Sequence, residues 1–195
     1  MTTKQIIQIL KSGGVGVLST DTLYGLVTPA LNPLAVERVY KLKNRAPDKP
    51  CIILINELSD LAKFGVEPNK TDLDLLKKLW PGKISVILPI TDSDASEKFA
   101  YLHRGAETLA FRLPALLKLR NLIKKTGPLI APSANPEGEK PAQTLHQAKR
   151  YFTTQTDFYF SFKPNHRATR ASTLVAIQGG KIIILRPGQA KLPTE

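Results

Sequence analysis

Residues 19–26 read Ser-Thr-Asp-Thr-Leu-Tyr-Gly-Leu, and they lie between a predicted strand and a predicted helix. This stretch follows a short apolar run, Val15 to Leu18, that predicts a buried strand. It precedes Asn32-Pro33, where Asn can cap a helix and Pro fits the first helical turn. In α/β proteins, a loop that follows a strand is a common place for a ligand site. The sequence therefore predicts a strand that opens into a hydroxyl-rich loop with a binding role.

A cluster of cations follows the helix that Asn32-Pro33 begins. We expect this helix to end near Lys43, and the loop 46–50 then leads to an apolar strand, Cys51 to Ile55. The four cations are Lys41, Lys43, Arg45 and Lys49. An ordinary solvated helix end also carries cations, because they favour the negative end of the helix dipole. Two prolines stiffen the loop, which favours cations held in place for a polyanionic ligand.

Length and composition are those of a globular protein. The 195 residues predict one domain, residues 1–195, and 42% of them are hydrophobic. No apolar run approaches the roughly 20 residues that cross a bilayer, and Met1 to Lys11 lacks the apolar centre of a secretory signal. The single cysteine, Cys51, excludes an internal disulfide and a cysteine zinc site. We therefore expect a cytoplasmic protein without a membrane partner.

The net charge is +12, from 28 basic and 16 acidic side chains. Such an excess favours nucleic acid, a nucleotide or another anionic partner. A generally basic surface without a specific partner explains the charge equally well. Charge alone leaves the two interpretations open.

Strands alternate with helices early in the sequence and form a hairpin late. Thr71 is expected to cap a helix that runs to Trp80, and the polar residues 91–97 are expected as a surface loop. The last two strands are expected to meet at a Gln178-Gly179-Gly180 turn. This order predicts an α/β fold with a mixed, twisted sheet.

Further polar residues stand at strand ends. Arg112 and Arg186 each end a predicted strand, which is uncommon for a side chain meant only to be solvated. Ser133 and Asn135 follow a short buried strand, although Asn could simply turn the loop. The hydroxyls of residues 20–24 could also bond to nearby backbone, and we adopt that interpretation for Thr22.

Several classes of site lack their motifs. No G-x-S-x-G elbow, H-E-x-x-H pair or P-loop is present, and Gly13 to Gly16 precede a strand instead of following one. The three histidines lie in unrelated segments. We therefore predict no transition-metal site, serine hydrolase or dinucleotide fingerprint.

The sequence as a whole resembles the YrdC-type threonylcarbamoyl-AMP synthases. Each shared motif is weak alone, but the ordered set, which spans nearly the whole chain, is specific. The motifs are residues 19–26, Lys43-x-Arg45, Lys49-Pro50, Trp80-Pro81-Gly82, Arg112-x-Pro114, Pro132-Ser133-Ala134-Asn135, Ser172-Thr173 and Leu185-Arg186-Pro187-Gly188. The resemblance implies a single YrdC-like α/β domain, with a twisted mixed sheet flanked by helices and a positively charged groove.

The resemblance also implies an activity. Members of this family are nucleotidyltransferases that form threonylcarbamoyl-AMP from L-threonine, bicarbonate and ATP, releasing diphosphate, for threonylcarbamoyladenosine modification of tRNA. Mg²⁺ is expected with ATP as the substrate. Transfer RNA or double-stranded RNA and the threonylcarbamoyl-transfer machinery are the implied partners.

Roles of single residues follow from the same resemblance. It implies catalytic roles for Lys43 and Arg45. The implied threonine-binding residues are Thr20, Tyr24, Arg45, Arg112 and Ser172. The implied nucleotide-binding residues are Lys43, Arg45, Ser133, Asn135 and Arg186.

Departures from the family pattern leave loop details and substrate preference open. They are Lys83-Ile84-Ser85 for Pro-Leu-Thr, Leu116 near a histidine position, Glu137 for a serine, and residues 161–167 for an Asp-Gly-Gly-rich segment. Two other functions remain open, a YciO-like paralogue with another small substrate and a non-catalytic module for structured RNA. Convergence of Thr20, Tyr24 and Arg112 would favour the enzyme, because RNA binding gives no reason for it.

Overall fold

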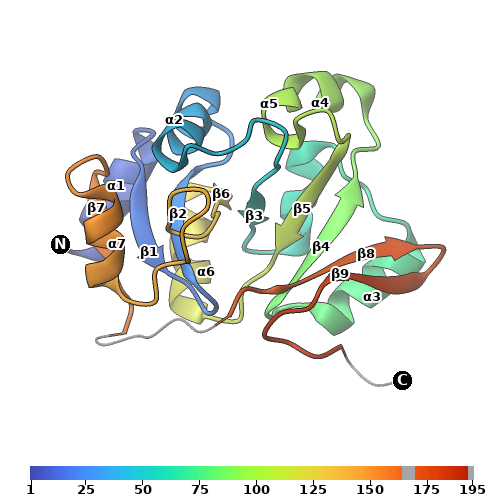
Figure 1. Ribbon diagram of the computed structural model, residues 1–195. Helices are drawn as coiled ribbons and strands as arrows, with labels where there is room; N and C mark the ends of the chain where they lie inside the picture. Colours follow the sequence, from blue (N-terminus) through green and yellow to red (C-terminus); the bar gives the residue numbers. More distant parts are fainter. Residues whose placement is uncertain (164–169, 193–195) are drawn as a thin grey trace.

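The computed structural model describes residues 1–163 and 170–192 (Figure 1). Within them the strands form one sheet in the order β7-β1-β2-β6-β3-β5-β4-β8-β9. The strands are β1 (Gly16–Ser19), β2 (Tyr24–Pro29), β3 (Ile52–Leu54), β4 (Ile84–Pro89), β5 (Thr108–Arg112), β6 (Leu129–Ile130), β7 (Phe158–Phe160), β8 (Thr173–Gln178) and β9 (Lys181–Arg186). The pairs β1–β7, β3–β5 and β4–β8 are parallel and the others antiparallel, which confirms the predicted mixed sheet.

Helices cover both faces of this sheet. They are α1 (Thr3–Lys11), α2 (Pro33–Lys43), the 3₁₀ helix η1 (Leu58–Phe64), α3 (Lys70–Leu79), α4 (Ser93–Lys98), α5 (Ala100–His103), α6 (Leu117–Thr126) and α7 (Leu145–Phe152). Ile6 of α1 and Leu122 of α6 belong to one apolar cluster with strand residues. Val36 of α2 and Phe152 of α7 belong to the other, larger cluster. The burial of apolar side chains on both faces holds the central strands in place.

Local sequence signals explain where several helices begin. Thr2 and Gln5 form a capping box at α1, and the Asn32 side chain accepts a hydrogen bond from the Ala35 N–H at the start of α2. Thr144 caps α7 in the same way. At its other end, α2 stops where Asn44 adopts the left-handed conformation, with a φ of 49°. That stop determines where the chain turns toward the loop 46–50.

Three sequence predictions are wrong in detail. Residues 24–29 form β2, which pairs with β1 directly, so the predicted loop is a tight hairpin turn followed by a strand. Asn69, and not Thr71, caps α3, because its side chain reaches the Asp72 N–H. The stretch 91–97 is largely helical, since Asp92 caps the short helix α4.

Other predictions are confirmed. Strand β5 and helix α7 have the expected bounds, and the β8–β9 turn uses Gly179 and Gly180 at positive φ. Residues 164–167 of the segment that departs from the family pattern lie outside the described residues. No helix in the described ranges is both long and apolar enough to cross a membrane.

Candidate functional site

A cavity of about 360 Å³ lies where the β1–β2 turn meets β5 and the start of β8. Its volume is typical of a small-molecule site. Most of the predicted site residues line it, namely Thr20, Tyr24, Arg45, Arg112, Ser133, Ser172 and Arg186. Lys43 and Asn135 are not among the described residues that line it. Three arginines therefore share one cavity, whereas the broad charged groove stays a prediction.

The β1–β2 turn is held together by its own hydroxyls. The Thr20 hydroxyl donates to the Leu23 carbonyl at 2.6 Å, so its single proton is committed. The Thr22 hydroxyl, 3.0 Å from the Thr20 hydroxyl, is then the donor of that pair. The Thr22 N–H also donates to the Thr20 oxygen at 3.0 Å. This network orders the turn at the wall of the cavity.

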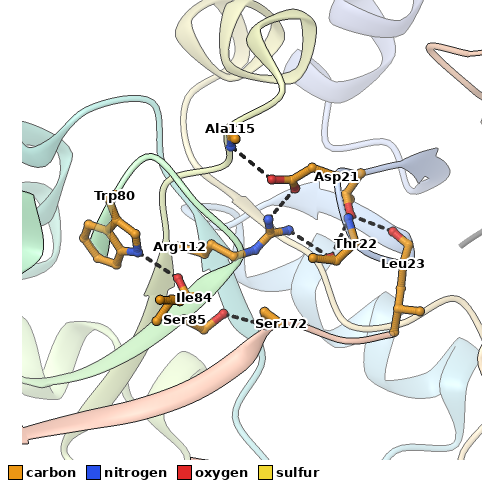
Figure 2. Close-up of polar contacts among 10 residues, drawn as sticks. Asp21, Thr22, Leu23, Trp80, Ile84, Ser85, Arg112, Ala115 and Ser172 are labelled. Carbon is orange, nitrogen blue, oxygen red and sulfur yellow. Dashed lines mark hydrogen bonds and ion pairs between the residues drawn. The ribbon is translucent and has the colours of Figure 1, made fainter. Parts of the chain in front are cut away.

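Arg112 is held against this turn at the end of β5 (Figure 2). Its Nη1 donates to Oδ1 of Asp21, and its Nη2 lies 3.4 Å from the Thr22 hydroxyl. The other carboxylate oxygen of Asp21 accepts the Ala115 N–H at 3.0 Å. Both charged side chains are nearly buried, with exposed fractions of 4% for Arg112 and 8% for Asp21. The sequence predicts Arg112 as a site residue but gives no sign of its partner Asp21. It predicts for Thr22 only a hydrogen bond to nearby backbone, whereas the Thr22 hydroxyl also lies near Arg112.

Ser172 and Arg186, which also line the cavity, contact each other. The Ser172 hydroxyl pairs with the Ser85 hydroxyl of β4 at 2.8 Å, as Figure 2 shows. The Arg186 Nη2 donates to the Ser172 carbonyl at 3.1 Å. Partial burial lowers the pKa of the Arg186 guanidinium below its usual range. The serine was predicted, but its partner on β4 was not.

Lys43 lies outside the cavity lining but contacts Ser133, which belongs to it. Its ammonium donates to the carbonyl oxygens of Ser133 and Asn135 at 2.6 and 2.5 Å, and the residue is 2% exposed. Burial, assisted by the charge of Arg45, lowers the pKa of Lys43 to about 8. The Asn135 side chain donates to two carbonyls of its own loop, Pro136 and Glu139. Lys43 therefore links the end of α2 to the loop 133–139.

Arg45 lines the cavity, and Arg45 and Lys49 are both bonded to neighbouring loops. Arg45 donates to the carbonyl oxygens of Lys49 and Pro50, both at 2.9 Å. Lys49 pairs with Glu137, which also accepts the Ala46 N–H at 2.5 Å. These bonds, led by the one from Lys49, lower the pKa of the Glu137 carboxyl. Glu137, noted only as a departure from the family pattern, thus fastens the loop 46–50 to the loop 133–139.

A second cavity, of about 340 Å³, also borders the β1–β2 turn. Thr20 and Thr22 line both cavities, whereas Asp21 and Lys83 line only the second. The turn therefore contributes to the lining of both cavities. Among the described residues, no group of three or more His, Cys, Asp or Glu side chains could hold a metal ion.

A family model agrees with the geometry. The model of the Sua5/YciO/YrdC family, described as "Telomere recombination", matches residues 8–188. The threonylcarbamoyl-AMP synthase of Bacillus subtilis is 37% identical over 142 residues, which is 72% of this chain and 40% of the relative. The enzyme of the same name from Pyrococcus abyssi is 30% identical over 183 residues, 92% of this chain and 52% of the relative.

A solved structure is similar as well. The crystal structure of P. abyssi Sua5 complexed with L-threonine has a TM-score of 0.81 and 26% identity, and the match covers 95% of this chain and 54% of that one. The chain thus spans only about half or less of the length of these relatives.

Proposed function

The chain belongs to the Sua5/YciO/YrdC family, and from this premise we propose that it forms threonylcarbamoyl-AMP from L-threonine, bicarbonate and ATP, releasing diphosphate. Two relatives carry the name of that activity, and a similar solved structure was obtained with L-threonine. The observation that carries the proposal is the convergence of hydroxyls and three arginines in one cavity. The product would serve threonylcarbamoyladenosine modification of tRNA.

The Arg112 end of the cavity is the proposed amino-acid subsite. A guanidinium offers a planar fork that matches a carboxylate, so Arg112 would bind the carboxylate of threonine. Tyr24 and Thr20 line the same cavity and would contact the side-chain hydroxyl. Because the Thr20 proton is already donated to Leu23, Thr20 would act there only by exchanging one of its present bonds.

The two other arginines of the cavity are assigned to the proposed nucleotide subsite. Arg45 and Arg186, which line the cavity, would bind the phosphates of ATP, and Ser133 would contact the nucleotide. Asn135 lies outside the cavity lining, so it would act by holding the loop 133–139 beside the nucleotide. Threonine's amine and bicarbonate would combine to a carbamate with loss of water. A carbamate oxygen would then attack the α-phosphorus, and diphosphate would leave. Cations positioned at the phosphates supply the charge stabilisation that phosphoryl chemistry needs, so no covalent nucleophile is required.

Magnesium and the wider partners belong to the same proposal. Mg²⁺ commonly binds through substrate phosphates and waters, so we expect it to arrive with ATP. We further propose a cytoplasmic role alongside the threonylcarbamoyl-transfer machinery, with tRNA or double-stranded RNA as an electrostatic partner.

Amino-acid selectivity tests the proposal. Diphosphate release, measured with saturating ATP and bicarbonate, should be strong with threonine and very weak with valine, because valine leaves the polar groups of the site unpaired. Serine loses only a methyl group, so its kcat/KM should fall by on the order of 10–200-fold. The proposal fails if threonine stimulates release no more than valine does. That result would favour a YciO-like paralogue with another substrate.

A further inference from the structure

We propose that Asp21 is a positioning residue that holds the Arg112 guanidinium in the orientation in which it binds the substrate carboxylate. The inference rests on the proposed function, because it assigns a specific device to the amino-acid subsite. Asp21 does not line the cavity that Arg112 lines. It would therefore act through Arg112 and not by touching the amino acid.

The carboxylate of Asp21 is itself held in place. One oxygen accepts from Nη1 of Arg112, and the other accepts the Ala115 N–H at 3.0 Å. Figure 2 shows the carboxylate between the guanidinium and the backbone at Ala115. Because Ala115 follows β5 by only a few residues, Asp21 joins the β1–β2 turn to the segment that carries Arg112. Both partners of the ion pair are therefore tied to the same part of the sheet.

The two cavities explain why this pair leaves Arg112 available. Arg112 lines the first cavity and not the second, whereas Asp21 lines the second and not the first, so the carboxylate does not occupy the lining of the cavity proposed for the substrate. A guanidinium has five N–H donors. Asp21 takes a bond from Nη1 and Thr22 a longer one from Nη2, at 3.4 Å. Further N–H groups remain for a ligand in the first cavity.

The Asp21–Arg112 ion pair favours recognition of a carboxylate by the geometry of the guanidinium over recognition by net positive charge. A buried guanidinium without a carboxylate is an uncompensated charge, and its side chain has no reason to keep one rotamer. With Asp21 in place, the Arg112 end of the cavity is close to neutral. It would then recognise a carboxylate by the geometry of the fork. Arg45 and Arg186 keep their positive charge near the proposed phosphate subsite.

The test compares the kinetics of Asp21→Ala and wild type. We expect the KM for threonine to rise at least about tenfold, with kcat at saturating threonine changed less than about threefold, since ground-state and transition-state binding are lost together. The KM for ATP should stay within about twofold. Asp21→Glu, which keeps the charge, should recover part of the loss. An unchanged KM for threonine, or an equal rise in the KM for ATP, would overturn the proposal.

A double-mutant cycle separates action through Arg112 from direct contact. In the Arg112→Ala background, Asp21→Ala should change kcat/KM for threonine by less than about twofold, because the residue it positions is already gone. A loss as large as in the wild-type background would show that Asp21 acts independently of Arg112, and the proposal would be wrong.

Asp157→Ala is the matched control. Asp157 also accepts from an arginine, Arg38 at 2.7 Å, and from a backbone N–H, that of Val15 at 2.7 Å, but it lies outside the cavity lining. It should lower thermal stability and leave the KM for threonine unchanged. If wild type binds threonine by calorimetry but releases no diphosphate, the proposed function fails, and the cycle is then read from the Kd for threonine. If wild type binds no threonine, both proposals fall.

Discussion

Among single residues, Lys43 and Arg45 differ in whether they line the cavity. The resemblance predicts that Lys43 contacts the nucleotide, yet its ammonium is bonded to the carbonyl oxygens of Ser133 and Asn135. Arg45 donates two hydrogen bonds to carbonyl oxygens of its own loop, and it also lines the cavity. A direct phosphate contact of Lys43 stays a prediction, whereas its contact with the loop 133–139 is a feature of the fold.

The buried ammonium should make stability depend on pH. Below about pH 8, Lys43 is charged in the folded and unfolded chain, and folding bears the cost of burying that charge. Between this pH and the ordinary lysine value of 10.5, only the unfolded chain keeps the proton, so stability rises with pH. The gain should be on the order of 3 kcal/mol. Urea unfolding of wild type and Lys43→Met between about pH 8 and pH 10.5 measures this gain in the free energy of unfolding. If the free energies of the two proteins change with pH in parallel, the prediction is wrong.

At the scale of elements, the β8–β9 hairpin completes the site through its two ends. Ser172 immediately precedes β8, and Gly188 follows β9 closely. A Cβ on Gly188 would lie 2.4 Å from the carbonyl carbon of Ser172 and from the Thr173 nitrogen. The two chain segments thus approach too closely for any side chain at residue 188. Glycine at residue 188 therefore permits the close approach of the two segments beside Ser172, which lines the cavity.

Gly188→Ala should therefore damage the site and the fold together. The methyl group would push against backbone, and overpacking of this kind costs about 1–3 kcal/mol of stability. Displacement of Ser172 should also raise the KM for threonine. Thermal unfolding together with threonine kinetics checks both effects. Wild-type values for both would show that the hairpin end moves aside freely.

Whether the sequence predicts a residue of the site depends on how far along the chain its contacts lie. Arg112 could be predicted because a strand end places it at the sheet edge. Asp21 could not, since its role comes from a contact with a residue 91 positions away. Glu137 accepts a hydrogen bond from Lys49, 88 positions away, so its contact could not be predicted from the sequence either. Strand β2 was missed because its hydroxyls and glycine suggest a loop, whereas its pairing with β1 and β6 is tertiary.

At the scale of the whole molecule, the net charge of +12 predicts how RNA would bind. The sequence contains no recognisable base-reading motif, so any RNA affinity should come mainly from phosphate contacts. Its logarithm should then fall linearly and steeply with the logarithm of salt concentration. Titrations of tRNA and unrelated double-stranded RNA at several salt concentrations measure this. Tight, salt-insensitive binding to one RNA would favour an RNA-binding module over an enzyme.

We propose above that threonine, bicarbonate and ATP react in one cavity to give a single product. The most direct measurement is mass spectrometry of the nucleotides formed when the protein is mixed with ATP, Mg²⁺, threonine and isotope-labelled bicarbonate. We predict an adenylate that contains threonine and carries the bicarbonate label, with diphosphate as the second product. Formation of no such adenylate, or of one without the label, would contradict the account.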